Sequence, residues 1–258
     1  MKILFLFLCL FTGFISGTAA GFFGVGGGII NVPFLLAIFY FFHEAGDPIK
    51  KSIASSLAVI FIASLSSAYT HFKTNKNLLL KNIFIIGLAG GIGAIPGAHI
   101  TISIQSIYLQ KALGVLEILA GFYILFYSEK ENGQQKIKPF MMGIFAFIAG
   151  ILSATFGIGG GIVFVPLTRF FTNYPLTDLI GYSSGMIPFV SFFGLSQYLW
   201  FEFSKGQDLI SIHAVIPMAI TSIIGARLGA KWVYLLNKEK LKVFYSIFLF
   251  VIGCILIY

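Results

Sequence analysis

The sequence predicts an all-α polytopic integral membrane protein that contains two homologous repeats. Hydrophobic residues make up 58% of its 258 residues and charged residues only 10%, whereas a soluble domain carries about 25% charged residues. Apolar segments that approach the roughly 20 residues of a membrane span recur along the whole chain. A glycine-rich motif in the first of these segments returns in the second half of the chain, which indicates an internal duplication.

The duplicated motif is a glycine run followed by a proline. Residues 23–33 read FGVGGGIINVP, and residues 156–166 read FGIGGGIVFVP. The match extends upstream, and half of the positions in 14–35 are identical to their counterparts in 147–168. Because this N-terminal stretch matches a mid-chain segment, we expect the apolar N-terminus to be retained rather than cleaved as a signal peptide.

Weaker matches extend the duplication beyond the glycines at a smaller offset. Ser55-Ser56 is matched with Ser183-Ser184, and Gly97-Ala98 is matched with Gly225-Ala226, which places His99 opposite Arg227. The chain then divides into a first transmembrane repeat (1–127), a polar linker (128–138) and a second transmembrane repeat (139–258). Each repeat would hold one glycine-broken helix with its half-helix and three transmembrane helices, about eight segments in all.

The path of the two glycine-broken segments decides how the repeats are oriented. If each segment crosses the membrane once, the 17 Lys and Arg residues divide 8 against 9 between the two sides. If each segment turns back as a hairpin, they divide 5 against 12, with the linker on the richer side. The positive-inside tendency favours hairpins, a cytoplasmic linker and both termini outside, and it makes the two repeats inverted. Broken helices of inverted repeats form the central sites of secondary transporters.

The two glycine turns are the predicted substrate site. A helix that restarts after a glycine run presents free backbone amides and its positive dipole end to the turn, which suits an oxyanion such as sulfite, sulfate, a sulfonate or a carboxylate. Close helix packing is the alternative explanation, because small residues let helices approach one another in lipid. The candidate ligands are the turn glycines Gly24, Gly26, Gly27, Gly28, Gly157, Gly159, Gly160 and Gly161.

Polar side chains near the turns are further candidate ligands. Hydroxyl groups are expected at the start of the helix that follows each turn, where they could donate hydrogen bonds to an anion or bond to their own helix. These residues are Ser55, Ser56, Tyr182, Ser183 and Ser184. Asn31 adds an amide to the first motif only, because the second motif has Phe164 at that place, so the two half-sites are expected to be unequal.

Three charged residues are candidates for coupling or charge neutralisation. Glu117 is the one acidic residue deep in an apolar segment, where it would carry a proton or bond to a neighbouring helix as a neutral acid. Arg169 and Arg227 could attract an anion or reach the headgroups. His99 is expected at an interface rather than in a site.

Enzymatic chemistry finds no support in the residue pattern. Cys9 and Cys254 lie in apolar segments at opposite ends of the chain, and the four histidines are scattered, so no metal-ligand spacing is present. We expect no catalytic residue, no metal and no cofactor. The net charge of +8 fits loop lysines on one side of a membrane better than a nucleic-acid surface.

These motifs resemble the sulfite exporter TauE/SafE family, also called the 4-toluene sulfonate uptake permease family. The resemblance rests on residues 24–33 and 157–166, on the two Gly-Ala copies and on the number of helices, and it covers essentially the whole chain. It implies a secondary transporter, with sulfite, sulfonates and related organosulfur anions among the substrates of the family.

The combined expectation is a multi-pass protein of the plasma membrane (a bacterial inner membrane) that moves small anions by alternating access around the two glycine turns. Its expected partners are the lipid bilayer and a small anionic solute, and no nucleic acid. Coupling to protons or another ion, and a homo-oligomer, are left open. A non-transporting assembly subunit and an anion channel are the alternative functions.

Overall fold

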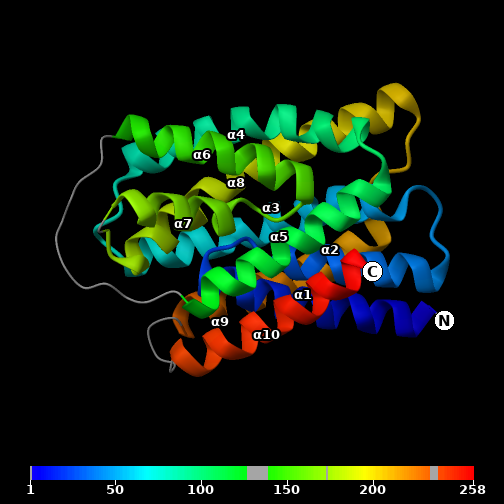
Figure 1. Cartoon of the computed structure of the whole chain (residues 1–258), viewed down its shortest axis with the longest axis horizontal. Helices are drawn as coiled ribbons and strands as arrows, with labels where there is room; N and C mark the ends of the chain where they lie inside the picture. Colours follow the sequence, from blue (N-terminus) through cyan, green and yellow to red (C-terminus); the bar gives the residue numbers. More distant parts are fainter. Residues whose placement is uncertain (1, 127–138, 173, 233–237) are drawn as a thin grey trace.

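The computed structural model describes residues 2–126, 139–172, 174–232 and 238–258, so the predicted 128–138 linker lies outside the described residues. The described part of the chain is helical and forms the following elements: α1 (Lys2–Phe23), α2 (Gly28–Phe42), α3 (Pro48–Thr74), α4 (Leu80–Ser103), α5 (Ser106–Phe126), α6 (Pro139–Phe156), α7 (Gly161–Phe171), α8 (Leu176–Lys205), α9 (Ile212–Trp232) and α10 (Lys238–Ile257). Five of the described helices, α1, α3, α4, α8 and α9, are long and apolar enough to cross a membrane. The fold is that of a polytopic α-helical membrane protein (Figure 1).

Each glycine motif interrupts a helix because its glycines take backbone conformations that other residues avoid. In the first motif φ is 65° at Gly24, 90° at Gly26 and 79° at Gly27. The second motif repeats these values closely, with positive φ at the three corresponding glycines. Glycine reaches this region without the steric cost of a Cβ atom. The helix therefore stops before each run and restarts as α2 at Gly28 and as α7 at Gly161.

Each restarted helix turns back along the helix that precedes it. The rings of Phe5, near the start of α1, and Phe42, at the end of α2, lie 5.1 Å apart. The corresponding contact in the second half joins Phe145 of α6 and Phe171 of α7, whose ring centroids are 5.2 Å apart. Both glycine-broken segments are thus helical hairpins, with their turns inside the molecule.

The two halves of the chain interlock and do not form separate bodies. α1 packs along α9, α4 along α6, α3 along α8 and α5 along α10, so every one of these pairs joins the two halves. Glycines allow the close approach: a Cβ built on Gly17 would lie 2.4 Å from the carbonyl oxygen of Ser222, and one on Gly150 would lie 2.0 Å from that of Gly90. Small residues at such contacts are typical of helices packed within a bilayer.

Both chain termini lie at the same end of the helix bundle (Figure 1). This end, the termini end, also contains the connections 43–47, 104–105 and 206–211. The opposite end contains residues 75–79 and residues 174–175 before α8, and there α5 ends and α6 begins. The membrane sidedness of these two ends stays a prediction.

The contacts between the halves show which residues of α4 and α9 are equivalent, and this equivalence differs from the sequence match. A Cβ on Gly93 would meet the carbonyl oxygen of Phe147 (2.2 Å), and one on Gly225 would meet that of Phe14 (2.3 Å). Since Phe14 and Phe147 are counterparts in the glycine repeat, Gly225 corresponds to Gly93 and not to Gly97. The pairing of His99 with Arg227 is therefore wrong, because Gly-Ala recurs every four residues in both helices and the match had slipped by one helical turn.

The helices after the glycine units begin earlier than expected. Asp47 caps α3, with its carboxylate accepting hydrogen bonds from the amides of Ile49 (3.2 Å) and Lys50 (3.3 Å). Pro48 follows at the first helical position, where its missing N–H costs nothing. Ser56 consequently lies about two turns inside α3 and does not open the helix. The serines of α8 likewise lie inside their helix, which begins at Leu176.

Candidate substrate site

The two glycine turns meet at the centre of the molecule, backbone against backbone. A Cβ on Gly26 would lie 2.9 Å from the Cα of Gly159, and a Cβ on Gly159 would lie equally close to the Cα of Gly26. The first residue of each half-helix touches the opposite turn in the same way. A Cβ on Gly28 would lie 2.0 Å from the carbonyl oxygen of Gly157, and one on Gly161 would lie 1.9 Å from that of Gly24.

This contact brings the N-termini of α2 and α7 together. The first backbone hydrogen bonds of α2 run from Ile30 and Asn31 to the carbonyl oxygen of Gly27, and those of α7 run from Val163 and Phe164 to that of Gly160. The amides that precede them have no acceptor within their own helix. Two positive helix ends therefore face one central region.

A buried serine holds the carbonyl of each turn from the opposite half of the chain. Ser56 Oγ of α3 donates to the carbonyl oxygen of Gly157, and Ser183 Oγ of α8 donates to that of Gly24, both at 2.7 Å. The offset that relates this pair is 127 residues, one fewer than the sequence match gave, so Ser56 corresponds to Ser183 and not to Ser184. Both hydroxyl protons are directed to the turns.

The other hydroxyl candidates bond away from the turns. Ser55 Oγ accepts a hydrogen bond from the amide of Ser211 at 3.0 Å, and the Tyr182 hydroxyl accepts one from the amide of Leu79 at 3.4 Å. Ser184 Oγ accepts a hydrogen bond from Ser67 at 3.4 Å. The structure thus separates the predicted set into two serines at the turns and three residues that join helix α3 or α8 to neighbouring segments.

Two buried polar atoms beside the turns have no hydrogen-bond partner among the described residues. One is Oδ1 of Asn31 in the first turn of α2, a residue only 1% exposed. The other is the hydroxyl of fully buried Ser153, whose Cβ would lie 3.3 Å from a Cβ built on Gly160. Buried polar groups are nearly always hydrogen-bonded, so each of these atoms is available to a bound group.

Ser153 is the residue that the sequence reasoning missed. The repeat alignment places it opposite Ala20, about one helical turn before the glycine run. A serine where the other copy has alanine is the feature that could have identified it. Asn31 and Ser153 make the two half-sites chemically unequal, in opposite halves of the chain.

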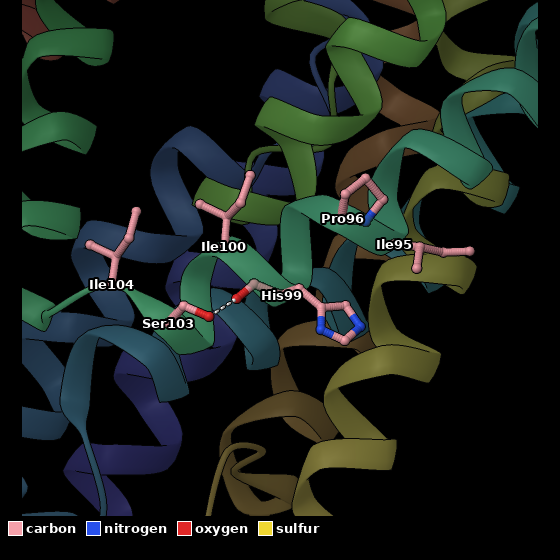
Figure 2. Close-up of a pocket in the computed structure, with 6 residues that line it drawn as sticks. All are labelled: Ile95, Pro96, His99, Ile100, Ser103 and Ile104. Atoms are coloured by element: carbon pink, nitrogen blue, oxygen red, sulfur yellow. Dashed lines mark hydrogen bonds between the residues drawn. The ribbon is translucent and has the colours of Figure 1, made fainter.

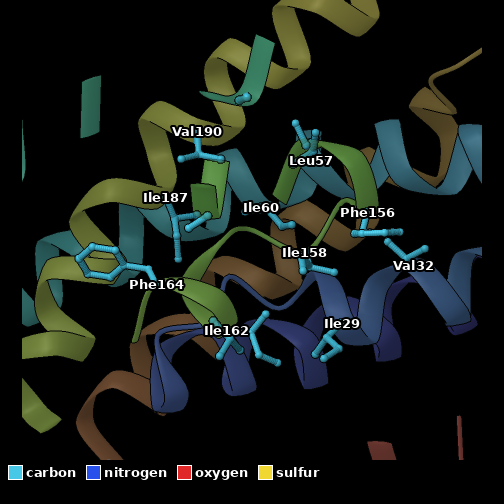
Figure 3. Packing of buried hydrophobic residues seen from close by; sticks show 14 of the residues in the cluster. Ile29, Val32, Leu57, Ile60, Phe156, Ile158, Ile162, Phe164, Ile187 and Val190 are labelled. Carbon is cyan, nitrogen blue, oxygen red and sulfur yellow. The ribbon is translucent and has the colours of Figure 1, made fainter. Parts of the chain in front are cut away.

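Aliphatic side chains surround the turns (Figure 3). Ile29, Ile158 and Ile162 come from the motifs themselves, and Ile60 of α3 and Ile187 of α8 cover them. Ile60 and Ile187 occupy equivalent places. Ile60 lies 3.5 Å from a Cβ built on Gly159, and Ile187 lies 3.5 Å from a Cβ built on Gly26, so each contacts the turn of the other half of the chain. In the described part of the chain, the polar groups found beside the turns are backbone groups, Asn31 and the buried serines.

The two candidate arginines lie away from the glycine turns. Arg227 Nε donates to Ser66 Oγ at 3.1 Å, and Ser66 lies ten residues beyond Ser56 on α3, roughly 15 Å along the helix. Arg169 lies in the last turn of α7, roughly 12 Å along that helix from Gly161, and it donates to the carbonyl oxygen of Tyr174. Neither guanidinium group is part of the central contact.

Glu117 is fully buried, as expected, but it lies between α5 and α10. It is flanked on its helix face by Gly114 and Gly121, on which a Cβ would lie 2.7 Å and 3.1 Å from backbone oxygens of Gly253 and Ser246. Both carboxyl oxygens of Glu117 have no hydrogen-bond partner among the described residues. Among the described residues, no side chain of a neighbouring helix bonds to this acid, and its role stays a prediction.

A groove of about 560 Å³ lies on the outer face of α4 and not at the turns (Figure 2). It is lined by Ile95, Pro96, His99, Ile100, Ser103 and Ile104. His99 directs its ring to Phe201 of α8, with the ring centroids 4.9 Å apart. Because one helix face supplies all these residues and most are apolar, the groove does not resemble an anion site.

Comparison with known protein families aligns residues 9–256 with the family described as Sulfite exporter TauE/SafE. The chain belongs to the TauE/SafE sulfite exporter family. The aligned region includes both glycine hairpins and all three helices that follow each of them. Membership in this family makes the chain a membrane transporter and agrees with residence in the plasma membrane.

Curated relatives of this TauE/SafE member carry transporter names. "Probable membrane transporter protein MJ0441" of Methanocaldococcus jannaschii is 32% identical over 259 residues, which cover 97% of this chain and 95% of the relative. A "Probable membrane transporter protein" of Haemophilus influenzae is 28% identical, covering 96% of this chain and 97% of the relative. "Probable membrane transporter protein YunE" of Bacillus subtilis is 27% identical and covers 95% of each chain. These names indicate a transporter rather than an enzyme, and no solved structure matches the chain.

Proposed function

We propose that the protein is a secondary transporter of small anions, with sulfur oxyanions or organosulfonates such as sulfite as its substrates, and that the anion binds where the two glycine turns meet. The observation that carries this proposal is the convergence of the N-termini of α2 and α7 beside two unpartnered buried polar atoms. Free amides and positive helix ends favour a negatively charged ligand.

The glycine contact restricts how an anion can reach these amides. Where Gly26 faces Gly159 there is no room even for a methyl group. An anion that touches both half-helices must therefore move the turns apart by about one layer of atoms, since backbone groups now occupy that space. Alternating access provides this separation, with one hairpin moving relative to the other as the site opens toward one side.

The chemical class of the substrate follows from the groups that surround the turns. They supply backbone N–H groups, hydroxyl groups and one amide, and among the described residues no Lys or Arg side chain contacts the glycines. Such a site suits a compact anion with several oxygen atoms, since each oxygen can accept hydrogen bonds from fixed donors. The amide of Asn31 can present its NH₂ group instead of Oδ1 after rotation about its terminal torsion angle. The family description, which names sulfite, favours a sulfur oxyanion among these compact anions.

Flux into proteoliposomes tests the proposal. Purified protein is reconstituted, and uptake of sulfite, sulfate, thiosulfate, sulfoacetate, taurine and simple carboxylates is followed with and without a pH gradient. Saturable uptake of a sulfur anion is the expected result, and an inactive variant of the turns is the control. Absence of uptake for all these solutes, from protein that elutes as a single folded species, would overturn the proposal and favour the assembly-subunit alternative. Flux that does not saturate would favour a channel.

A further inference from the structure

We propose that two polar clamps, one at each end of the packed helices α3 and α8, are the gates of the substrate path and open one at a time. The inference rests on the proposed transport function, and it assigns residues to the conformational change that transport requires. The residues are Lys51 with Glu44 and Asp208 at the termini end, and Asp178 with Asn75 at the opposite end.

The first clamp is built around the buried side chain of Lys51 in the first turn of α3. Its Nζ atom donates to Asp208 Oδ2 at 2.8 Å, to Glu44 Oε2 at 3.3 Å and to the carbonyl oxygen of Ala45 at 2.9 Å. Asp208 follows the end of α8, and Glu44 and Ala45 follow the end of α2. One lysine thus ties the start of α3 to the end of α8 and to the open end of the first hairpin.

The second clamp occupies the equivalent place at the other end. Asp178, in the first turn of α8, accepts a hydrogen bond at 2.6 Å from the side-chain amide of Asn75, which follows the end of α3. The offset between Lys51 and Asp178 is the same 127 residues that relates Ser56 to Ser183. Asn75 and Asp208, the partners in the two clamps, are separated by the same number of residues as Gly24 and Gly157. These partners are therefore equivalent to each other as well.

Behind each clamp, one helical turn deeper in the molecule, lies a further polar contact. At the termini end the amide of Ser211 donates to Ser55, and at the opposite end the amide of Leu79 donates to the hydroxyl of Tyr182. The next residues along α3 and α8 are Ser56 and Ser183, which hold the glycine turns. Each end is therefore closed by two successive polar contacts on the way to the turns.

The two clamps differ in charge, so one can open while the other stays closed. The Lys51 side chain is 4% exposed, and a buried charge without a partner is strongly unfavourable, so this clamp opens only if Lys51 becomes hydrated. Asn75 carries no charge, so its contact with Asp178 is a charge-assisted hydrogen bond and not an ion pair. Both are closed in this structure while the glycine turns touch, which is the arrangement expected of an occluded state between two open ones.

Cysteine accessibility tests the gates directly. In a background that lacks Cys9 and Cys254, Ser211→Cys reports on the termini end and Leu78→Cys on the opposite end, because both side chains are buried one turn behind a clamp. Labelling rates are measured with a membrane-impermeant maleimide applied to each face in turn, in whole cells and in inverted vesicles. Lys51→Met should raise the labelling rate of Ser211→Cys from the termini face about tenfold or more, and Asn75→Ala should do the same for Leu78→Cys from the opposite face only.

Matched variants separate gate opening from unfolding. Lys205→Met makes the same substitution at the same end on an exposed lysine, and Asn77→Ala alters an exposed neighbour of Asn75. Neither should change labelling. Lys51→Met leaves only the partly exposed carboxylates of Asp208 and Glu44, so no buried charge is stranded. If this variant does not elute as a folded species, Asn75→Ala tests the inference alone.

The outcomes distinguish the gates from the proposed function. Labelling that rises at one probe and one face only supports the gates, whether or not sulfite is the solute that moves. Labelling that rises at neither probe, or equally at both probes, in folded protein would overturn the gates even if sulfite flux is intact. Loss of all anion flux in the unmodified protein, with labelling shifts as described, would overturn the proposed function alone.

Discussion

At the scale of single residues, the glycines of the two motifs act in two ways. Gly24, Gly26 and Gly27 have positive φ values, so they are required by backbone conformation. Gly28 lies in the helix and is required by the close approach of the Gly157 carbonyl oxygen. Packing therefore accounts for the glycine pattern, and the free amides that result from it are the groups proposed to bind the anion. The two interpretations of the motif are compatible.

Alanine at the first residue of either half-helix should disrupt the central contact. Gly28→Ala and Gly161→Ala place a Cβ 2.0 Å and 1.9 Å from a carbonyl oxygen, well inside van der Waals contact. Such overpacking typically costs about 1–3 kcal/mol. We expect a lower melting temperature in detergent by intrinsic fluorescence. Gly143→Ala on α6 is the control, because its Cβ would meet only the Ala89 side chain at 3.9 Å. Equal melting temperatures for all three variants would contradict the close contact.

Removing the serine that holds each turn should weaken both turns to a similar degree. Ser56→Ala and Ser183→Ala leave a buried glycine carbonyl without its side-chain donor, which costs about 1–3 kcal/mol. Ser64→Ala on α3 is the matched control, since Ser64 donates within its own helix to Phe61 at 3.0 Å. The test is thermal unfolding of the three purified variants. A loss in Ser64→Ala as large as in the other two would refute a specific role at the turns.

At the scale of helices, α5 and α10 form a pair with an unusual acid at its interface. Glycines at both ends of the contact bring the helices close, and Glu117 lies between them with both carboxyl oxygens unpartnered among the described residues. Replacing an unsatisfied buried acid by an apolar side chain is often neutral or stabilising. The acid is therefore not explained by stability, which leaves proton coupling as its proposed role.

Replacing Glu117 should separate stability from coupling. Glu117→Leu should leave the melting temperature unchanged or raise it, because the desolvation cost of a partnerless carboxyl group disappears. In proteoliposomes the same variant should lose the stimulation of anion uptake by a pH gradient, while exchange without a gradient continues. A strongly destabilised Glu117→Leu, or full pH-gradient stimulation in that variant, would contradict this assignment.

The sequence predicts a helix correctly where a strong local feature marks its beginning or end. Glycine runs in apolar segments located both hairpins, because few residues other than glycine take positive φ values. The start of α3 was missed, although Asp47-Pro48 is a typical helix-start pair. The register of α4 against α9 was mistaken because Gly-Ala recurs at helical spacing, and only the contacts with α6 and α1 distinguish the two alignments.

At the scale of the whole molecule, interlocking of the halves is what the sequence could not show. Pairs such as α1 with α9 and α4 with α6 join residues far apart in the sequence through glycine contacts, such as Gly17 with Ser222 and Gly93 with Phe147. No local pattern records which partner a small residue meets. The candidate site was only partly predicted for the same reason. Ser56 and Ser183 bond to the turns, whereas Ser55 and Tyr182, the residues directly before them, bond to connecting segments.

The arrangement of the helices makes a topology prediction. Both termini share one end of the bundle, and α5 ends and α6 begins at the other. Single cysteines at positions 132 and 258 should therefore be labelled from opposite faces of the membrane, with position 132 reached only in inverted vesicles, because the positive-inside tendency places the linker in the cytoplasm. Labelling of both positions from the same face would contradict the hairpin arrangement and with it the inverted repeats.

The central claim is that an anion binds where the two glycine turns meet, and binding of radiolabelled sulfite to purified protein with an Asn31→Leu substitution tests it most directly. Asn31 is buried beside the first turn, and its side-chain NH₂ group, once turned toward the site, can donate to an anion. A hydrogen bond to a charged ligand is worth about 1.5–3 kcal/mol. The account predicts an affinity roughly ten- to a hundredfold weaker in Asn31→Leu, with folding intact and with unchanged affinity in the exposed control Asn77→Leu. Wild-type affinity in a folded Asn31→Leu variant would contradict it.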